Sequence, residues 1–461
     1  MLKDLKHIGE WYLANTDKKV IGVLTYNSSI GIVLELFGDL IDRKEFRTPT
    51  TDIILGISNS GKKITLYDCF ETNRTTNSFG KTTSKFVSQY LFIGNHFESE
   101  DELVFDSIYS RLYNLDEWMK IYGFKLFDSS FNDKKTELEY SLPNSIDFKI
   151  SQTLTGKINF TYIPPFIEQT NKITIEQKSE FYIKSEQTEN FKDLLRKFSH
   201  FQNFITFSTF KPSYPISLKL SNSSITRNIR SIKGEIPLII DFYFRHSYLI
   251  NRKDNYKHNI FLFDYQDIKS NFETIIEKWY EIEKLIKPIT SILIDSFYSK
   301  GVFDENSFLN VIQGLETFHR RFRLNKIIDE NDHKKRKEEV LENIPVEHQD
   351  WIKSILSFSN EPTLHMRIDE ILCELDIQTI KNIIKDKEQF IRDVKNSRNY
   401  YTHYDKRLEK KAKKSSELFQ LKEKLKVVLL AIVLKETGLE KTQIEKLLKD
   451  KEWMFFNHLL Q

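Results

Sequence analysis

Hydrophobic and polar positions alternate along most of the first half of the chain, which is the pattern of half-buried β-strands. Between about Lys19 and Phe263, short apolar runs are bounded by Asn, Ser, Gly and Pro, and one helical stretch, Glu189 to Thr209, interrupts them. Representative runs are KVIGVLTY (19–26), KKITLYDCF (62–70), GKINFTYI (156–163) and IPLIIDFYF (236–244). We therefore expect a predominantly β N-terminal half.

From Tyr265 onward, apolar residues recur with a period of about 3.6, which predicts amphipathic α-helices. Helices are expected over roughly 265–300, 305–326, 332–357, 362–384, 386–405, 412–436 and 440–459. A polar stretch, NRKDNYKHN (251–259), separates the two patterns. The sequence predicts an α+β multidomain protein, with a β-rich region over 1–260 followed by an all-α helical bundle over 261–461.

The composition, the net charge and the cysteines indicate where the protein is located in the cell, but they do not identify a binding partner. The net charge of the 461 residues is only +3, so any basic surface that attracts a polyanion must be local. Cys69 and Cys373 are far apart in sequence, which argues against a disulfide framework. The N-terminus lacks an apolar signal segment, and the apolar run Val427–Leu434 is too short to cross a bilayer. We expect a cytoplasmic protein without a membrane-spanning segment.

Several familiar catalytic motifs are missing from the sequence. Gly80-Lys81-Thr82 lacks the upstream glycine of a P-loop, and no GxSxG segment occurs. Glu316-x-x-His319 and Glu330-x-x-His333 have the spacing of carboxylate-bridged di-iron bundles, but the further glutamate pair is not evident. A di-iron bundle stays an alternative that metal analysis would reveal. Otherwise no metal and no cofactor is expected.

The segment VKNSRNYYTH (394–403) places an arginine, an asparagine and a histidine within six residues of a predicted helix. At about 100° per residue, two stripes run along this helix. The stripe that can face a core consists of Phe390, Val394, Ser397 and Tyr401. The polar stripe consists of Arg392, Asn396, Asn399 and His403. A titratable histidine is therefore displayed outside the core.

These residue types suit the cleavage of a phosphodiester. A histidine that titrates near neutrality can donate or accept a proton. An arginine can bind a phosphate through two N–H groups, and an asparagine can orient either side chain. With RNA, the 2′-hydroxyl of the substrate can be the nucleophile, so no metal is needed. The plainer alternative is that the three side chains decorate a solvated helix face.

Arg398 and His403 lie about 140° apart on an ideal helix, so they do not point toward one phosphate. Three arrangements would resolve this: the helix is distorted, Arg398 reaches around it, or a second copy of the helix shares the substrate. The third arrangement predicts a homodimer, or a dimer of dimers, joined through the C-terminal bundles.

The segment RNYYTH (398–403) matches the R-N-x-x-x-H motif of HEPN-domain ribonucleases, and the surrounding helices resemble the ApeA-like HEPN group of bacterial anti-phage defence proteins. FLNVIQGLETFHRRF (308–322) is similar to that group's early helix with an embedded glutamate. LHMRIDEIL (364–372) is similar to its middle helix with an arginine. The resemblance is specific over about 300–435, and before residue 265 only the β-rich architecture is similar.

The resemblance implies a metal-independent endoribonuclease of abortive anti-phage defence, with tRNA among the candidate substrates. Cleavage would leave a cyclic phosphate or its hydrolysis product. By motif position, His403 would be the general acid/base, Arg398 the phosphate ligand and Asn399 a positioning residue. By family analogy alone, the region 1–260 would be a regulatory sensor of a phage-derived trigger.

Residues outside the motif extend the candidate site. Glu316, on another predicted helix, could fix Arg398 or His403, and its alternative is a surface pair with Arg320. His319 is expected to be packed or exposed to solvent.

The segment 406–426 holds nine lysines or arginines and three glutamates. Its candidates for RNA binding are Lys406, Arg407, Lys410 and Lys411. A lysine-rich surface loop is the alternative. Tyr404 could stack on a base, whereas Tyr401 is expected in the core.

One rival function belongs to another class. A non-catalytic HEPN adaptor would bind nucleic acid or a partner protein through the same bundle. The presence of Arg398, Asn399 and His403 together favours the enzyme, because an adaptor would not need all three.

Overall fold

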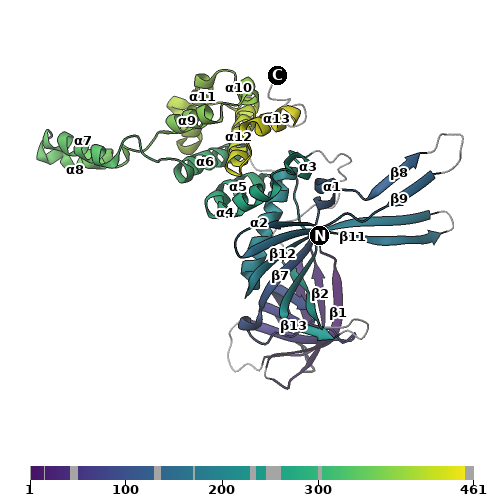
Figure 1. Ribbon diagram of the computed structural model, residues 1–461. Helices are drawn as coiled ribbons and strands as arrows, with labels where there is room; N and C mark the ends of the chain where they lie inside the picture. Colours follow the sequence, from purple (N-terminus) through teal and green to yellow (C-terminus); the bar gives the residue numbers. More distant parts are fainter. Residues whose placement is uncertain are drawn as a thin grey trace. The chain divides into compact units, whose positions relative to one another are not determined.

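The computed structural model describes residues 2–14, 16–41, 50–128, 136–169, 172–228, 235–245, 261–298 and 304–451. The chain divides into two compact units, Met1–Glu273 and Thr274–Gln461. The linker predicted at 251–259 and the end of the first region predicted at residue 260 lie outside the described residues. Figure 1 shows a β-rich region followed by a helical region, which confirms the predicted fold class.

The first unit is built from antiparallel strands whose burial alternates as the sequence pattern predicts. In the second strand, for example, every other side chain from Val20 to Tyr26 is buried. The strands are β1 (Leu5–Tyr12), β2 (Val20–Asn27), β3 (Gly31–Leu36), β4 (Thr50–Ser58), β5 (Lys63–Thr76), β6 (Thr82–Ile93), β7 (Val104–Leu112), β8 (Phe124–Asp128), β9 (Thr136–Tyr140), β10 (Ile146–Lys149), β11 (Leu154–Gln169), β12 (Lys172–Asn190), β13 (Pro215–Asn228) and β14 (Glu235–Phe244).

The first six strands close into a ring. The order of the large sheet is β10-β11-β12-β7-β13-β14-β6-β3-β2-β1-β4-β5, and β5 pairs back onto β6. The other strands continue from β6 through β14 as an open sheet, while β8 and β9 pair separately. A Cβ at Gly56 of β4 would lie 2.3 Å from Cε3 of Trp11 in β1, so glycine lets the buried indole pack against this strand.

One long helix packs on the open sheet. It is α2 (Phe191–Thr209), close to the helix predicted at 189–209, and the Asn190 side chain caps it by accepting a hydrogen bond from the Lys192 amide. Phe201 of α2 stacks on Phe181 of β12, with ring centroids 3.5 Å apart. The short helices of this unit are η1 (Glu100–Glu102), α1 (Leu115–Met119) and α3 (Tyr265–Ile268).

The second unit is helical. Its elements are α4 (Phe272–Glu281), which begins at the unit boundary, α5 (Glu283–Tyr298), α6 (Asp304–Phe322), α7 (Glu330–Glu342), α8 (Val346–Ile355), η2 (Leu356–Phe358), α9 (Leu364–Leu375), α10 (Gln378–Ile384), α11 (Lys387–His403), η3 (Lys406–Leu408), α12 (Ser415–Glu436) and α13 (Lys441–Lys451). The run Val427–Leu434 of α12 is buried throughout. None of the described helices is both long and apolar enough to cross a membrane.

Close helix packing in this unit depends on a glycine. A Cβ at Gly314 of α6 would lie 2.9 Å from Cδ2 of Leu429 in α12. Because Gly314 has no side chain, α6 can approach α12 closely. Helix α6 also carries Glu316.

Three of the predicted helices are each divided in the structure, which corrects the expected boundaries. The stretch predicted at 265–300 is divided into α3, α4 and α5. The stretch predicted at 332–357 is split into α7 and α8, because Pro345 precedes α8 and cannot continue α7. The stretch predicted at 362–384 is split into α9 and α10 at Asp376, whose backbone is left-handed with φ 44°.

Candidate active site

Helix α11 carries the motif and is regular from Lys387 to His403. Its start is capped by Asp386, whose side chain accepts a hydrogen bond from the Gln389 amide. The predicted core stripe is buried, and it consists of Phe390, Val394, Ser397 and Tyr401. The helix ends at Tyr404, which adopts the left-handed conformation with φ 50°. Because the helix is unbroken, distortion does not bring Arg398 and His403 together.

The polar stripe of α11 is accessible to solvent. Arg392 and His403 are exposed, and Asn396 and Asn399 are half-buried. The His403 imidazole makes no hydrogen bond with the other described residues. Beside it, the exposed Tyr404 ring lies 5.5 Å from the ring of Tyr400. The last turn of α11 therefore presents an imidazole and aromatic faces to solvent.

Arg398 lies on the flank of α11 that faces α6. Its Nη2 is 3.8 Å from Oε1 of Glu316, and its Nη1 donates to Oδ1 of Asn399 at 3.3 Å. Arg320, the alternative partner of Glu316, pairs with Glu361 at 2.8 Å. The Arg398 side chain is still 33% exposed, so its guanidinium is held from two sides and can reach an anion in solvent.

A buried network lies behind this pair, between α6 and α9. Nη1 of Arg367, which is 2% exposed, donates to Nδ1 of the fully buried His319 at 2.9 Å. Because an arginine can only donate, Nε2 carries the imidazole proton, and it donates to Oε2 of Glu370 at 2.8 Å. Burial and the nearby Arg320 lower the pKa of Arg367, while Glu316 opposes this shift. The network therefore links the α6–α9 interface electrostatically to Glu316.

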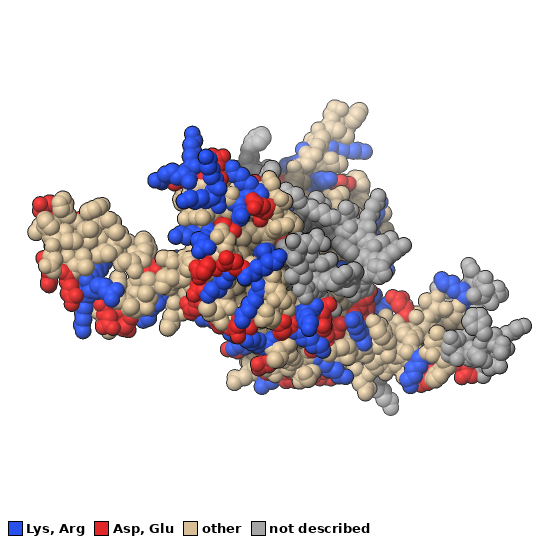
Figure 2. All heavy atoms as spheres, turned by 90° about the horizontal axis from the view of Figure 1, so that it is seen from above, with Lys and Arg blue, Asp and Glu red and all other residues tan. Residues whose placement is uncertain are grey.

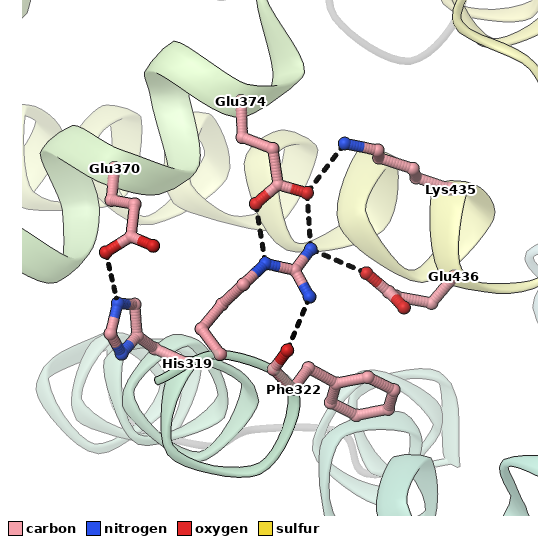
Figure 3. A network of polar contacts seen from close by, with 7 residues as sticks. His319, Phe322, Glu370, Glu374, Lys435 and Glu436 are labelled. Carbon is pink, nitrogen blue, oxygen red and sulfur yellow. Dashed lines mark hydrogen bonds and ion pairs between the residues drawn. The ribbon is translucent and has the colours of Figure 1, made fainter. Parts of the chain in front are cut away.

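A second polar cluster ties α6, α9 and α12 together (Figure 3). Nε of Arg323 donates to Glu374 at 2.7 Å, its Nη2 donates to Glu436 at 2.7 Å, and Lys435 donates to Glu374 at 2.6 Å. Burial opposes the charge of Arg323, but hydrogen bonds from its guanidinium to Glu374 and Glu436 outweigh burial and raise its pKa. This cluster holds the helices that carry Glu316 and Arg367.

The basic segment that follows the motif is attached to α11. The Lys413 amide donates to Oγ of Ser397 at 3.0 Å, and the Tyr401 hydroxyl donates to the Lys413 carbonyl at 2.9 Å. Arg407 pairs with Asp405 at 2.7 Å and is 89% exposed, and its hydrogen bonds lower the pKa of Asp405. The other predicted RNA-binding residues are exposed, namely Lys406, Lys410 and Lys411.

The two Glu-x-x-His pairs are not joined by further carboxylates, as a di-iron site would require. Glu316 faces Arg398, and His319 accepts from Arg367. His333 lies 2.9 Å from the Ser359 hydroxyl. Among the residues that the structure describes, no three His, Cys, Asp or Glu side chains are placed to hold a metal ion. Arginines beside Glu316 and His319 make this place suited to an anion rather than to a metal cation.

Sequence reasoning left Arg367 and Glu370 out of the site and gave His319 no role outside the di-iron alternative. The structure brings His319 into the buried network. A signal was present in α9, where Arg367, Glu370 and Glu374 recur at helical spacing beside apolar residues. Charges that recur on one face of a helix with a buried apolar face indicate partners on a neighbouring helix.

Comparison with known families matches two parts of the chain. Residues 6–279 match the ApeA N-terminal domain 1. Residues 309–443 match the Apea-like HEPN domain, and this range includes every residue of the candidate site. No curated protein and no solved structure matches the chain significantly. The first match alone spans more than half of the sequence, so the chain belongs to the ApeA family, with an ApeA N-terminal domain followed by an ApeA-like HEPN domain.

Proposed function

We propose that this protein is a metal-independent HEPN endoribonuclease that acts in the bacterial cytoplasm in abortive anti-phage defence. HEPN domains are usually nucleases and commonly bind RNA and dimerise, which supports this class of activity. One observation carries the proposal. Arg398, held by Glu316 and Asn399, and the exposed His403 lie accessible to solvent at the end of one regular helix.

In the proposed reaction, the 2′-oxygen of a ribose attacks the adjacent phosphorus. The 2′-O–P bond forms while the P–O5′ bond breaks, which gives a 2′,3′-cyclic phosphate and a 5′-hydroxyl. A base removes the proton of the 2′-hydroxyl, and an acid protonates O5′. The Arg398 guanidinium stabilises the charge that develops on the non-bridging oxygens, and Asn399 orients that guanidinium.

The two proton transfers favour a site shared by two chains. Each chain offers one exposed imidazole in its motif, His403, and α11 holds it well away from Arg398 around the helix axis. Two copies of α11 related by a two-fold axis would supply one imidazole as base and the other as acid. The composite cleft would also place the Arg398 of one chain near the His403 of the other.

The rest of the chain has supporting roles in this proposal. The basic segment that begins at Lys406 would attract RNA to the cleft, so cleavage would weaken as salt rises. Glu316 would fix Arg398, and Tyr404 would stack on a base. The region 1–260 would restrain the nuclease until a phage-derived trigger binds. Transfer RNA is one candidate substrate.

The test compares the wild-type motif with His403→Ala, each in the full chain and in the fragment 274–461 that lacks the proposed restraint, on total tRNA and on an RNA oligonucleotide that covers a mapped cut. In EDTA, we expect wild type to leave a cyclic phosphate end. His403→Ala should be at least about 100-fold slower, because it removes the general acid/base. Its thermal unfolding should be unchanged, since the side chain is exposed.

A matched substrate separates the chemistry from binding. The same oligonucleotide with a 2′-deoxyribose at the cut should bind but stay intact, because its nucleophile is missing. Cleavage of this oligonucleotide, or wild-type cleavage by His403→Ala, would contradict the proposal. Wild-type protein that binds RNA and never cuts it, either as the full chain or as the fragment 274–461 without the proposed restraint, would point to the adaptor.

A further inference from the structure

A cavity of about 250 Å³ lies in the second unit, between the end of α10, the first half of α11 and the first half of α12. Its apolar floor is formed by Ile384, Phe390 and Leu421, which are themselves buried. The cavity is just below the usual range of ligand pockets, about 300–1,000 Å³, so a small organic molecule fits it. Neither Arg398 nor His403 lines it, so it is separate from the candidate active site.

The carboxylates that line the cavity already have partners. Asp386 accepts from the Gln389 amide at 2.9 Å, and Asp393 accepts from Nε2 of Gln389 at 2.8 Å. Nζ of Lys413 lies 3.7 Å from Asp393 and 3.2 Å from Glu417. The negative charges at this end of the cavity are therefore largely compensated within the protein.

Two lysines of the lining, Lys385 and Lys424, are not compensated in this way. Neither side chain forms an ion pair or a hydrogen bond with another residue that the structure describes. Burial and the charge of Lys385 lower the pKa of Lys424, although Asp393 opposes this shift. Figure 2 shows Lys and Arg side chains gathered over part of the helical unit with Asp and Glu side chains among them, so positive potential is local. An anion between the two ammonium groups would relieve their repulsion.

The backbone of Lys385 is strained where it meets the cavity. Its φ is 67° and its ψ is −75°, and the Asp386 amide donates to the Ile384 carbonyl at 3.0 Å. This geometry is the γ-turn that is rare for residues with a side chain, whereas glycine adopts a positive φ readily. Strained residues cluster at ligand-binding positions. A lysine where glycine would cost less indicates that its side chain has a use.

The two lysines favour one ligand chemistry. An ammonium group is a compact charge without the planar fork of arginine, and the oxygens of a tetrahedral phosphate can be shared between two such groups. We propose that this cavity binds a small phosphomonoester, with its phosphate between Lys385 and Lys424 and its apolar body over Ile384, Phe390 and Leu421. This site goes beyond the proposed nuclease, because binding does not need the motif residues.

The first test is calorimetry of the full chain with phenyl phosphate, inorganic phosphate and phenol. We expect phenyl phosphate to bind with a dissociation constant below about 1 mM, at least about tenfold tighter than either fragment of it. Lys424→Met should weaken this binding at least about tenfold, because it removes a charged donor. Lys395→Met is the matched control, since Lys395 is an exposed lysine of α11 outside the cavity. It should bind like wild type.

A second variant separates lost binding from lost folding. Lys385→Gly removes one of the two charges and also relieves the strained backbone. We expect it to weaken phenyl phosphate binding at least about tenfold and to raise the urea midpoint. A variant that is more stable and binds less cannot have lost binding by unfolding. Unchanged binding by Lys385→Gly would overturn the placement of the phosphate.

Pyridoxal 5′-phosphate tests the position of the ligand, because it is itself a phosphomonoester with a flat ring. The unprotonated amine of Lys424 attacks its aldehyde carbon, water leaves, and borohydride then adds hydride to the imine to give a stable secondary amine. Since the pKa of Lys424 is lowered, we expect mass spectrometry to find it modified before Lys395. Phenyl phosphate should protect Lys424, and pyridoxal without the phosphate should label it more slowly. Equal labelling of the two lysines, or no protection, would contradict the proposal.

Competition separates the two sources of such a phosphate, with His403→Ala used so that RNA stays intact. If a short RNA with a 3′-phosphate displaces phenyl phosphate and the same RNA without it does not, the ligand is an RNA end. If neither displaces it, the ligand is a free metabolite. Displacement by both RNAs, equal affinity for inorganic and phenyl phosphate, or no binding of phenyl phosphate would overturn the proposal. Because the variant lacks the proposed acid/base, these results do not depend on the nuclease.

Discussion

Arg398 and Arg392 lie on the same helix in different surroundings. Arg398 is half-buried beside Glu316 and Asn399, whereas Arg392 is exposed and donates to Gln389 at 3.0 Å. Lysine keeps the charge but lacks the planar fork that grips a phosphate with two hydrogen bonds. In single-turnover assays, we expect Arg398→Lys to slow RNA cleavage at least about 100-fold and Arg392→Lys to leave it unchanged. Equal losses would show that only the total positive charge of α11 matters.

Arg367 and Arg320 share the partner Glu361 and differ in burial. The Arg367 side chain is 3% exposed and the Arg320 side chain is 52% exposed. Removing Arg367 also leaves Nδ1 of the buried His319 without its donor. In urea unfolding, we expect Arg367→Ala to lower the free energy of unfolding by about 3 kcal/mol. Arg320→Ala should lower it by less than about 1 kcal/mol. Similar small losses for both would mean that the buried network adds little stability.

At the scale of elements, the cluster that joins α6, α9 and α12 makes stability depend on pH. Burial tends to raise the pKa of Glu374, but the hydrogen bond from Arg323 and that from Lys435 outweigh burial and hold the pKa below 4.5. A carboxyl group whose pKa is lowered by folding stabilises the fold above its unfolded pKa. This contribution is lost as the pH falls through the folded value.

We expect Glu374→Gln to have a lower urea midpoint than wild type at pH 7. Between about pH 5 and pH 3, the midpoint of Glu374→Gln should fall less than that of wild type, because the carboxyl group that titrates is missing. Glu409→Gln is the control, because Glu409 is exposed and its ion pair among the described residues is with the exposed Lys414. A Glu374→Gln curve parallel to that of wild type would place the acid sensitivity in other carboxyl groups.

The sequence predicted elements better than their ends. The spacing at which apolar residues recur in a strand or a helix is a local property of the sequence. The β-rich half, α2 and α11 could therefore be predicted from it. The break between α9 and α10 could not, since the apolar period continues across Asp376 and only its left-handed backbone ends the helix.

The same contrast holds for the candidate site. The motif residues are nearly contiguous, so they were visible in the sequence. The hydrogen bonds of His319 with Arg367 and Glu370 depend on how α6 packs against α9. The apolar spacing within either helix does not determine this packing.

At the scale of the whole molecule, the two compact units correspond to separate family matches. If the first unit restrains the nuclease, residues 274–461 expressed alone should be more toxic to bacteria than the full chain. Colony counts after induction would measure this, and the same fragment with His403→Ala should be harmless. A soluble fragment that is no more toxic than the full chain would argue against restraint by the first unit.

The closed ring of β1 to β6 has a consequence for synthesis on the ribosome. All of its strands are complete at Ile93, when about four fifths of the chain is still untranslated. At roughly 5–20 residues per second, the remainder takes on the order of 20–70 s. Antiparallel β-domains fold within about milliseconds to seconds, so the ring can close long before α11 leaves the exit tunnel. If the first unit restrains a nuclease that harms its own cell, this order of translation would let that unit begin to fold before α11 and its motif exist.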